Sequence, residues 1–160
     1  HHRMVHLAPS GERVESLFAS LSMARTPHRA HLGSGVDIFA HGGLDLMAVN
    51  ALLAVDVHGF SACGHCGAEI QFTMSGETIQ RIAPEGAAAF QRSWDGRSSI
   101  AGHVSAQSPL FCANPCLVAY QETHSMCDGL PVSADLLLSM GVALSNALGD
   151  ARFRLVRHTG

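Results

Sequence analysis

The chain has 160 residues, of which 47% are hydrophobic and only 14% are charged, and its formal net charge at pH 7 is −3. This balance predicts a globular protein with a core of its own and argues against a disordered chain. A weakly acidic chain offers no basic field to nucleic acid, and no apolar run reaches the roughly 20 residues of a membrane span. We therefore expect neither nucleic acid nor a membrane as a partner.

The first ten residues, HHRMVHLAPS, resemble the remnant of a purification tag followed by an N-terminal tail. Residues 11–160 are expected to form a single domain, because no linker, repeat or low-complexity tract interrupts them. The five cysteines cannot all pair within one chain. This odd number favours a reducing compartment, and we expect a bacterial protein of the cytoplasm.

Three patterns in the first part of the chain predict a helix, a hairpin and a second helix. Ser10 can cap a helix over residues 11–24, where apolar residues recur at helical spacing until Pro27 breaks the pattern. The segments HRAHL and VDIFA flank GSG and predict a hairpin. The second helix is expected over residues 43–54.

The middle of the chain reads mainly as strands. GFSAC and AEIQFTM flank GHCG and predict a second hairpin with a cysteine at each shoulder. The alternation in TIQRIA predicts another strand, and a Pro-containing turn then leads to AAAF. Residues 91–110 are polar and rich in Gly and Ser, which indicates a loop with a short helix near 98–106.

The last part combines strand and helix signals. A buried strand is expected over residues 116–120, followed by the loop HSMCDGLP. Ser133 can cap a helix over residues 134–148, Gly149 can end it, and ARFRLV can form a last strand. Taken together, the elements predict an α+β domain in which antiparallel or mixed β-hairpins pack with about three helices.

The motif CGHCG places Cys63 and Cys66 on one tight turn. Two thiolates at this spacing can share a tetrahedral Zn²⁺, and a structural zinc needs two more ligands. Cys112 and Cys116 form a C-x3-C pair that could supply them. Alternatively the cysteines pack as small hydrophobic residues. A redox dithiol is disfavoured, because its nucleophile normally lies at a helix N-terminus and this motif falls between strands.

Two further residues are candidates for chemistry. Cys112 follows Pro109 at the mouth of an apolar strand, where a ligand can reach a thiol, although a buried inert cysteine is the alternative. Asp45 falls on the first turn of the predicted helix, where it can simply interact with the helix dipole. Its apolar neighbours would raise the pKa of the carboxyl group, which suits a proton donor.

Together these stretches resemble the alkylmercury (organomercurial) lyase family. The segment IFAHGGLD aligns without a gap with the family's pattern of an aliphatic residue, an aromatic residue, Ala, any residue, Cys, Ala, any residue and Asp, and LFCANPC resembles its Phe-Cys segment. The stretches GFSACGHCGAEIQF, IAPEGAAAF and DGLPVSADLLLSMGVALSNAL also resemble family segments. The resemblance covers about residues 28–148 and implies an alkylmercury-lyase-like core. It places Asp45 on the family's aspartate and Cys112 on its second active-site cysteine.

The resemblance implies a division of labour. In the family, two soft thiolates hold mercury, and the aspartate delivers a proton to the departing carbon. The family's first cysteine falls on Gly42, which shares a helix face with Asp45, so this chain lacks that ligand. The expected substrate pocket around Asp45 comprises Phe39, His41, Gly42 and Cys116.

Two enzymatic functions follow from these residues. The first is cleavage of carbon–mercury bonds by protonolysis, with Asp45, Cys112 and a substitute thiol from Cys116 or Cys127. The second is acid/base chemistry on another small organic substrate, for which Gly42 leaves room. Neither requires a cofactor.

The alternative is a non-catalytic protein. In this hypothesis the thiolates of Cys63 and Cys66, with Cys112 or Cys116, bind zinc, copper or mercury. The expected partner is thus a small-molecule substrate or a soft metal ion, and the sequence does not indicate the oligomeric state.

Overall fold

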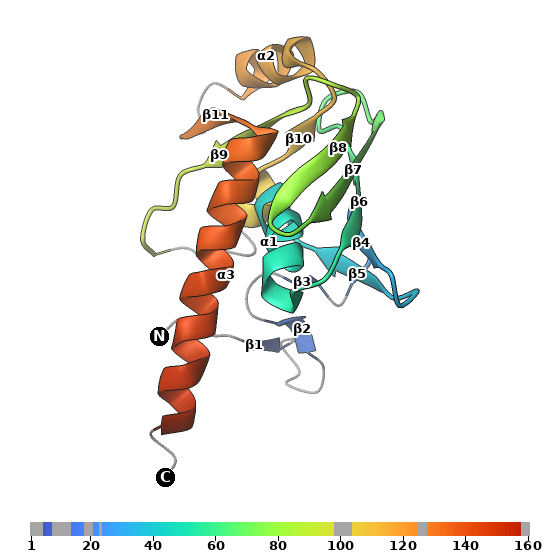
Figure 1. The fold of residues 1–160 in the computed structure, drawn as a ribbon. Coiled ribbons are helices and arrows are strands. Elements are labelled where there is room, and N and C mark those ends of the chain that lie inside the picture. Colours follow the sequence, from blue (N-terminus) through green and yellow to red (C-terminus); the bar gives the residue numbers. More distant parts are fainter. Residues whose placement is uncertain are drawn as a thin grey trace.

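The computed structural model describes residues 5–7, 14–17, 21–22, 24–97, 104–124 and 128–157. Within them, one sheet has eight antiparallel strands in the order β1-β2-β3-β5-β4-β6-β7-β8 (Figure 1). The strands are β1 (Val5–Leu7), β2 (Val14–Leu17), β3 (Leu21–Ser22), β4 (His28–Leu32), β5 (Asp37–Ala40), β6 (Val57–Ala62), β7 (Glu69–Ser75) and β8 (Thr78–Ala83).

A second, smaller sheet and the helices complete the described part of the fold. The small sheet has the order β10-β9-β11, with both outer strands antiparallel to the central one. Its strands are β9 (Ala88–Arg92), β10 (Leu110–Phe111) and β11 (Gly129–Ser133). The helices are α1 (Gly43–Leu53), α2 (Asn114–Thr123) and α3 (Ala134–Arg157), with a short 3-10 turn η2 (Ser105–Gln107).

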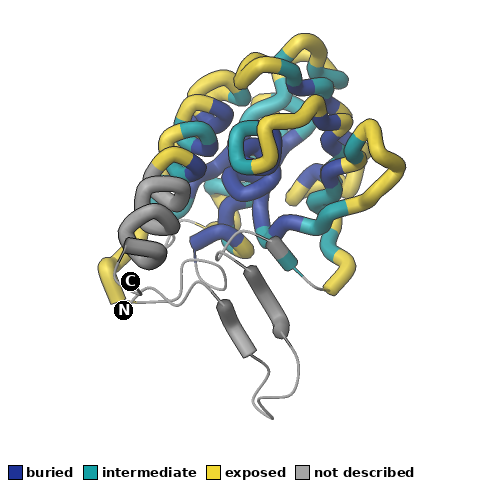
Figure 2. Tube along the Cα trace, turned by 60° about the horizontal axis from the view of Figure 1, so that its bottom comes forward, coloured by how far each residue is buried: buried dark blue, intermediate teal, exposed yellow. Residues whose placement is uncertain are grey.

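Helix α1 forms the centre of the core. It packs between α3 and the strands β4, β5 and β6, and its residues 43–50 are all buried (Figure 2). A helix that is apolar on every side is stable only when it is covered on every side. The larger sheet covers one side of this core. Every second residue of β7 is buried, and Ile70, Phe72 and Met74 face inward. The site residues at the start of α1 are therefore held by a rigid core.

The α+β class predicted from the sequence is confirmed, and so are several of its elements. Both predicted hairpins form, as β4–β5 and β6–β7, and TIQRIA and AAAF form β8 and β9. The predicted helix over residues 43–54 is α1. Ser133 caps α3 as expected, because its Oγ accepts the backbone N–H of Leu136 at 3.2 Å. The short helix expected near 98–106 is η2, although residues 98–103 lie outside the described residues.

Three local predictions are wrong. The segment 11–24 contains the strands β2 and β3, because pairing with β1 and β5 overrides its helical spacing. The segment 116–120 belongs to α2, whose first turn holds a proline, a residue well suited to helix starts. The segment ARFRLV belongs to α3, which continues through Gly149 to Arg157. None of the described helices is long and apolar enough to cross a membrane.

Candidate functional site

Four cysteine sulfurs converge between the β6–β7 loop and the start of α2. The Sγ atoms of Cys63, Cys66, Cys112 and Cys116 all lie within 4.8 Å of one another. The Cys66–Cys112 and Cys112–Cys116 sulfur distances are both 3.6 Å, and the Cys116–Cys66 distance is 3.8 Å. All four cysteines are free thiols in the structure. The C-x2-C pair and the C-x3-C pair therefore form one cluster.

The β6–β7 loop contributes the first pair of thiols. Cys63 directly follows β6, and its N–H donates to the carbonyl of Ala68, which closes the loop. The Gly64 N–H donates to the carbonyl of Leu110 at 2.8 Å. A side chain at Gly64 would place its Cβ 2.6 Å from Pro109, so the glycine permits this close approach. The loop is thereby fixed against β10.

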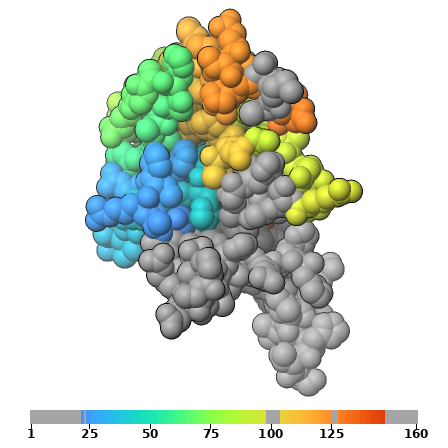
Figure 3. Space-filling model, turned by 180° about the vertical axis from the view of Figure 1, so that it is seen from behind, coloured from blue at the N-terminus to red at the C-terminus, as the bar shows by residue number. Residues whose placement is uncertain are grey.

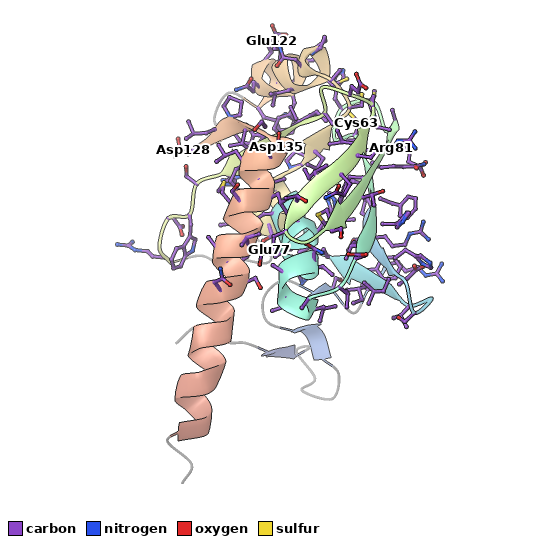
Figure 4. The ribbon with its side chains drawn as sticks, in the orientation of Figure 1. Cys63, Glu77, Arg81, Glu122, Asp128 and Asp135 are labelled. Carbon is purple, nitrogen blue, oxygen red and sulfur yellow. The ribbon has the colours of Figure 1, made fainter. Side chains whose placement is uncertain are left out.

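The second pair comes from the junction of β10 and α2. Cys112 follows β10 directly, and Cys116 lies on the first turn of α2, where its N–H donates to the carbonyl of Ala113. A spacing of four residues places both sulfurs at the N-terminal end of this helix. In Figure 3 the segment around the β6–β7 loop and the α2 segment lie side by side at the top of the molecule, and Figure 4 labels Cys63 there.

The thiols differ in their pKa values. Burial acts to raise the pKa of the Cys63 thiol, but hydrogen bonds from the backbone N–H groups of Cys66, Cys112 and His65 outweigh it and lower this pKa to about 6. Hydrogen bonding to Cys66, followed by burial, raises the pKa of Cys112 to about 12. Of these two thiols, Cys63 therefore loses its proton more readily, and Cys112 holds its proton more tightly.

The sulfur spacing fits one tetrahedral metal ion. Zn–S bonds of about 2.3 Å imply edges of about 3.8 Å between the sulfurs of a tetrahedron. The three edges among the sulfurs of Cys66, Cys112 and Cys116 are 3.6, 3.6 and 3.8 Å. No movement of the backbone is thus required to seat a cation of this size among these three sulfurs.

Asp45 is distant from the four cysteines in the sequence, but the helix that carries it contacts β10. It is fully buried on the first turn of α1. On the same turn, a Cβ on Gly43 would lie 2.9 Å from the side chain of Leu110, two residues before Cys112. The start of α1 therefore packs against the strand that leads into the cysteine cluster. The catalytic roles of Asp45 and Cys112 remain predictions.

Gly42 caps α1 in an extended conformation, and the space beside it is full. A Cβ there would lie 2.0 Å from the carbonyl oxygen of Ser105 and 2.7 Å from its carbon. The room that the sequence analysis expected at this glycine is thus taken by the backbone of η2. A cysteine at this position would require η2 to move.

The other predicted pocket residues lie in different surroundings. His41 is half-buried between β5 and α1. Phe39 lines a cavity of about 600 Å³ together with Phe60 and Arg25, and the four cluster cysteines are not among the residues that line it. Cys127, the other thiol considered as a substitute ligand, lies outside the described residues.

Comparisons with known proteins agree with this architecture. The family model of MerB, alkylmercury lyase, matches residues 21–146. The solved structure of the mercury-bound form of MerB2 is similar with a TM-score of 0.81 and 22% identity, over 92% of this chain and 70% of that one. At this identity the structural likeness shows the fold, and no curated protein matches the chain. On the strength of the family match over most of its length, the chain belongs to the alkylmercury lyase family.

Proposed function

We propose that this member of the alkylmercury lyase family is a metal-binding protein whose four cysteine thiolates hold one divalent cation. The observation that carries the proposal is the approach of four sulfurs to within 4.8 Å of one another. Four protein thiolates fill a tetrahedral shell and leave no open position, as in structural zinc sites.

Zinc is the cation that this donor set fits best. Soft thiolate ligands select Zn²⁺, Cu⁺ and iron–sulfur centres, and a tetrahedral set of four sulfurs is typical of zinc or iron. The separations of 3.6–3.8 Å suit a single ion at the centre. Thiolates also bind Hg²⁺, so mercury would compete with zinc for the same sulfurs.

Elemental analysis tests this proposal directly. Protein purified without its N-terminal histidines is expected to hold one zinc per chain. Cys63→Ser and Cys116→Ser should lose it, whereas Cys127→Ser, which leaves all four proposed ligands in place, should keep it. Circular dichroism checks that each variant is folded. A folded wild-type protein that carries no metal and takes none from a zinc buffer would contradict the proposal.

A second function, protonolysis of carbon–mercury bonds, is favoured by the position of Asp45. This buried acid lies on the first turn of the helix that packs against the strand leading to Cys112. Cys112 and a thiolate 3.6 Å away, from Cys66 or Cys116, would bind the mercury, so the thiol absent at Gly42 has two substitutes. Asp45 would give its proton to carbon as the carbon–mercury bond breaks, and the hydrocarbon would leave while Hg²⁺ stays on sulfur.

Release of hydrocarbon from an organomercurial, in the presence of excess small thiol, tests the second function. Asp45→Asn should abolish the release, and Cys127→Ser should leave it unchanged. Hydrocarbon release by Asp45→Asn at the wild-type rate would refute the role of the acid. We do not propose acid/base chemistry on another organic substrate, because the space it needs beside Gly42 is filled by Ser105.

A further inference from the structure

The four sulfurs of the cluster differ in how far solvent can reach them. Cys63 is only 4% exposed, and the backbone N–H groups of Cys66, Cys112 and His65 hydrogen-bond its sulfur. Cys66, three residues later, is exposed, and Cys112 and Cys116 are half-buried. An incoming soft cation therefore meets the sulfur of Cys66 first, and the sulfur of Cys63 is the last to be reached.

The sulfurs also come from two separate halves of the chain. Cys63 and Cys66 belong to the β6–β7 loop, whereas Cys112 and Cys116 belong to the β10–α2 junction. Three kinds of contact hold these two segments together at the cluster: the backbone bond from Gly64 to Leu110, the packing of Gly64 against Pro109, and the thiols themselves. A cation joins the halves only if it bonds to at least one sulfur from each.

Cations differ in how many thiolates they can bond. Zn²⁺ takes all four sulfurs of a tetrahedral site. Hg²⁺ carries no organic group and bonds strongly to two or more thiolates. A monovalent organomercury cation, RHg⁺, has carbon on one side and offers one strong position to sulfur. It can occupy a thiolate of either half, but it cannot connect the halves.

We propose that the thiol cluster distinguishes the two forms of mercury: RHg⁺ displaces the zinc and separates the β6–β7 loop from the start of α2, whereas Hg²⁺ replaces the zinc and keeps them joined. This inference rests on the proposed metal-binding function. Entry is at Cys66, where the zinc–sulfur bond breaks and a mercury–sulfur bond forms. Protonolysis of bound RHg⁺ to Hg²⁺ would rejoin the two segments.

Both exchanges balance without any redox partner. Four RHgCl react with one zinc tetrathiolate to give four Cys–S–HgR groups, one Zn²⁺ and four chloride ions. One HgCl₂ reacts with the same centre to give a mercury thiolate, one Zn²⁺ and two chloride ions. No electrons are transferred, and each sulfur exchanges one metal for another.

The test uses zinc-loaded full-length protein carrying Cys127→Ser, so that only the four cluster thiols react. Asp45→Asn is added in a parallel sample, so that cleavage cannot convert the probe to Hg²⁺ during the assay. If that variant does not fold, brief exposure of the Asp45 protein replaces it. The probes are HgCl₂ and methylmercury chloride. Released zinc is measured with a chromophoric chelator, and amide hydrogen exchange is measured over residues 62–69 and 110–118.

The two probes should give different results. One equivalent of HgCl₂ should release the zinc with little change in exchange, whereas methylmercury should need several equivalents and speed exchange in both segments by about tenfold or more. Equal protection with both probes, or opening by HgCl₂, would overturn this inference while leaving zinc binding intact. Protein that takes up no zinc at the start would overturn this inference and the proposed function together.

Discussion

Removal of zinc should lower the free energy of unfolding. The size of the loss depends on how far apart the bridged cysteines lie in the sequence. A cation shared by Cys66 and Cys112 links residues 46 apart in the sequence. Closing a loop of this length restricts the unfolded chain by about 4 kcal/mol in the chain-entropy model. With a urea slope of about 2 kcal/mol/M, zinc should therefore raise the midpoint of unfolding by about 2 M.

Urea denaturation with and without a strong zinc chelator measures this difference. The double variant Cys112→Ser/Cys116→Ser removes one half of the cluster, so its unfolding midpoint should not depend on zinc. Cys127→Ser serves as the control and should respond as the wild type does. If zinc leaves the wild-type midpoint unchanged, or stabilises the double variant equally, the cross-link between the two segments does not exist.

Three further predictions concern the surroundings of the site. Gly42→Ala should lower the free energy of unfolding by about 2 kcal/mol, because its Cβ meets the carbonyl of Ser105. Gly33→Ala, in open space, should change it by less than about 0.5 kcal/mol, and equal effects in urea denaturation would contradict the crowding at Gly42. Burial lowers the pKa of His28 from 6.5 to about 4. Between these pH values the imidazole is protonated in the unfolded chain but not in the folded protein, so the free energy of unfolding falls as pH decreases from 6.5 to 4. The loss should reach about 3 kcal/mol at pH 4 and should be absent in His28→Gln, as unfolding at pH 7 and pH 4 will reveal. Asn50→Ala should cost about 2 kcal/mol, because Asn50 is buried and its amide bonds the carbonyl of Val55 and the N–H of Glu77; an unchanged urea midpoint would count against this.

The sequence predicted those elements whose signals are local. Gly-rich turns between alternating segments indicated the β4–β5 and β6–β7 hairpins, and both formed. The helix predicted over residues 11–24 was wrong because the strands of this segment pair with β1 and β5. Local spacing does not reveal such contacts. The run CLVAY in α2 is short enough to suit a strand or a helix, and Pro115 was the available signal for a helix start.

The site was predictable in its parts but not in its assembly. The spacing of Cys63 and Cys66 indicated a metal knuckle, and the C-x3-C pair was noted as a source of two more ligands. What joins them is the packing of Gly64 on Pro109 and Leu110, which depends on the tertiary fold. The crowding of Gly42 by Ser105 likewise comes from a segment distant in the sequence, and no local sequence pattern predicts it.

X-ray absorption at the zinc edge of the purified wild-type protein tests the central claim most directly. We expect one shell of four sulfur neighbours at about 2.3 Å, the distance of a zinc tetrathiolate. Cys112→Ser/Cys116→Ser should lose this shell, and Cys127→Ser should retain it. A spectrum dominated by nitrogen or oxygen neighbours, or four sulfurs that persist in the double variant, would contradict the assignment of the cluster as the metal centre.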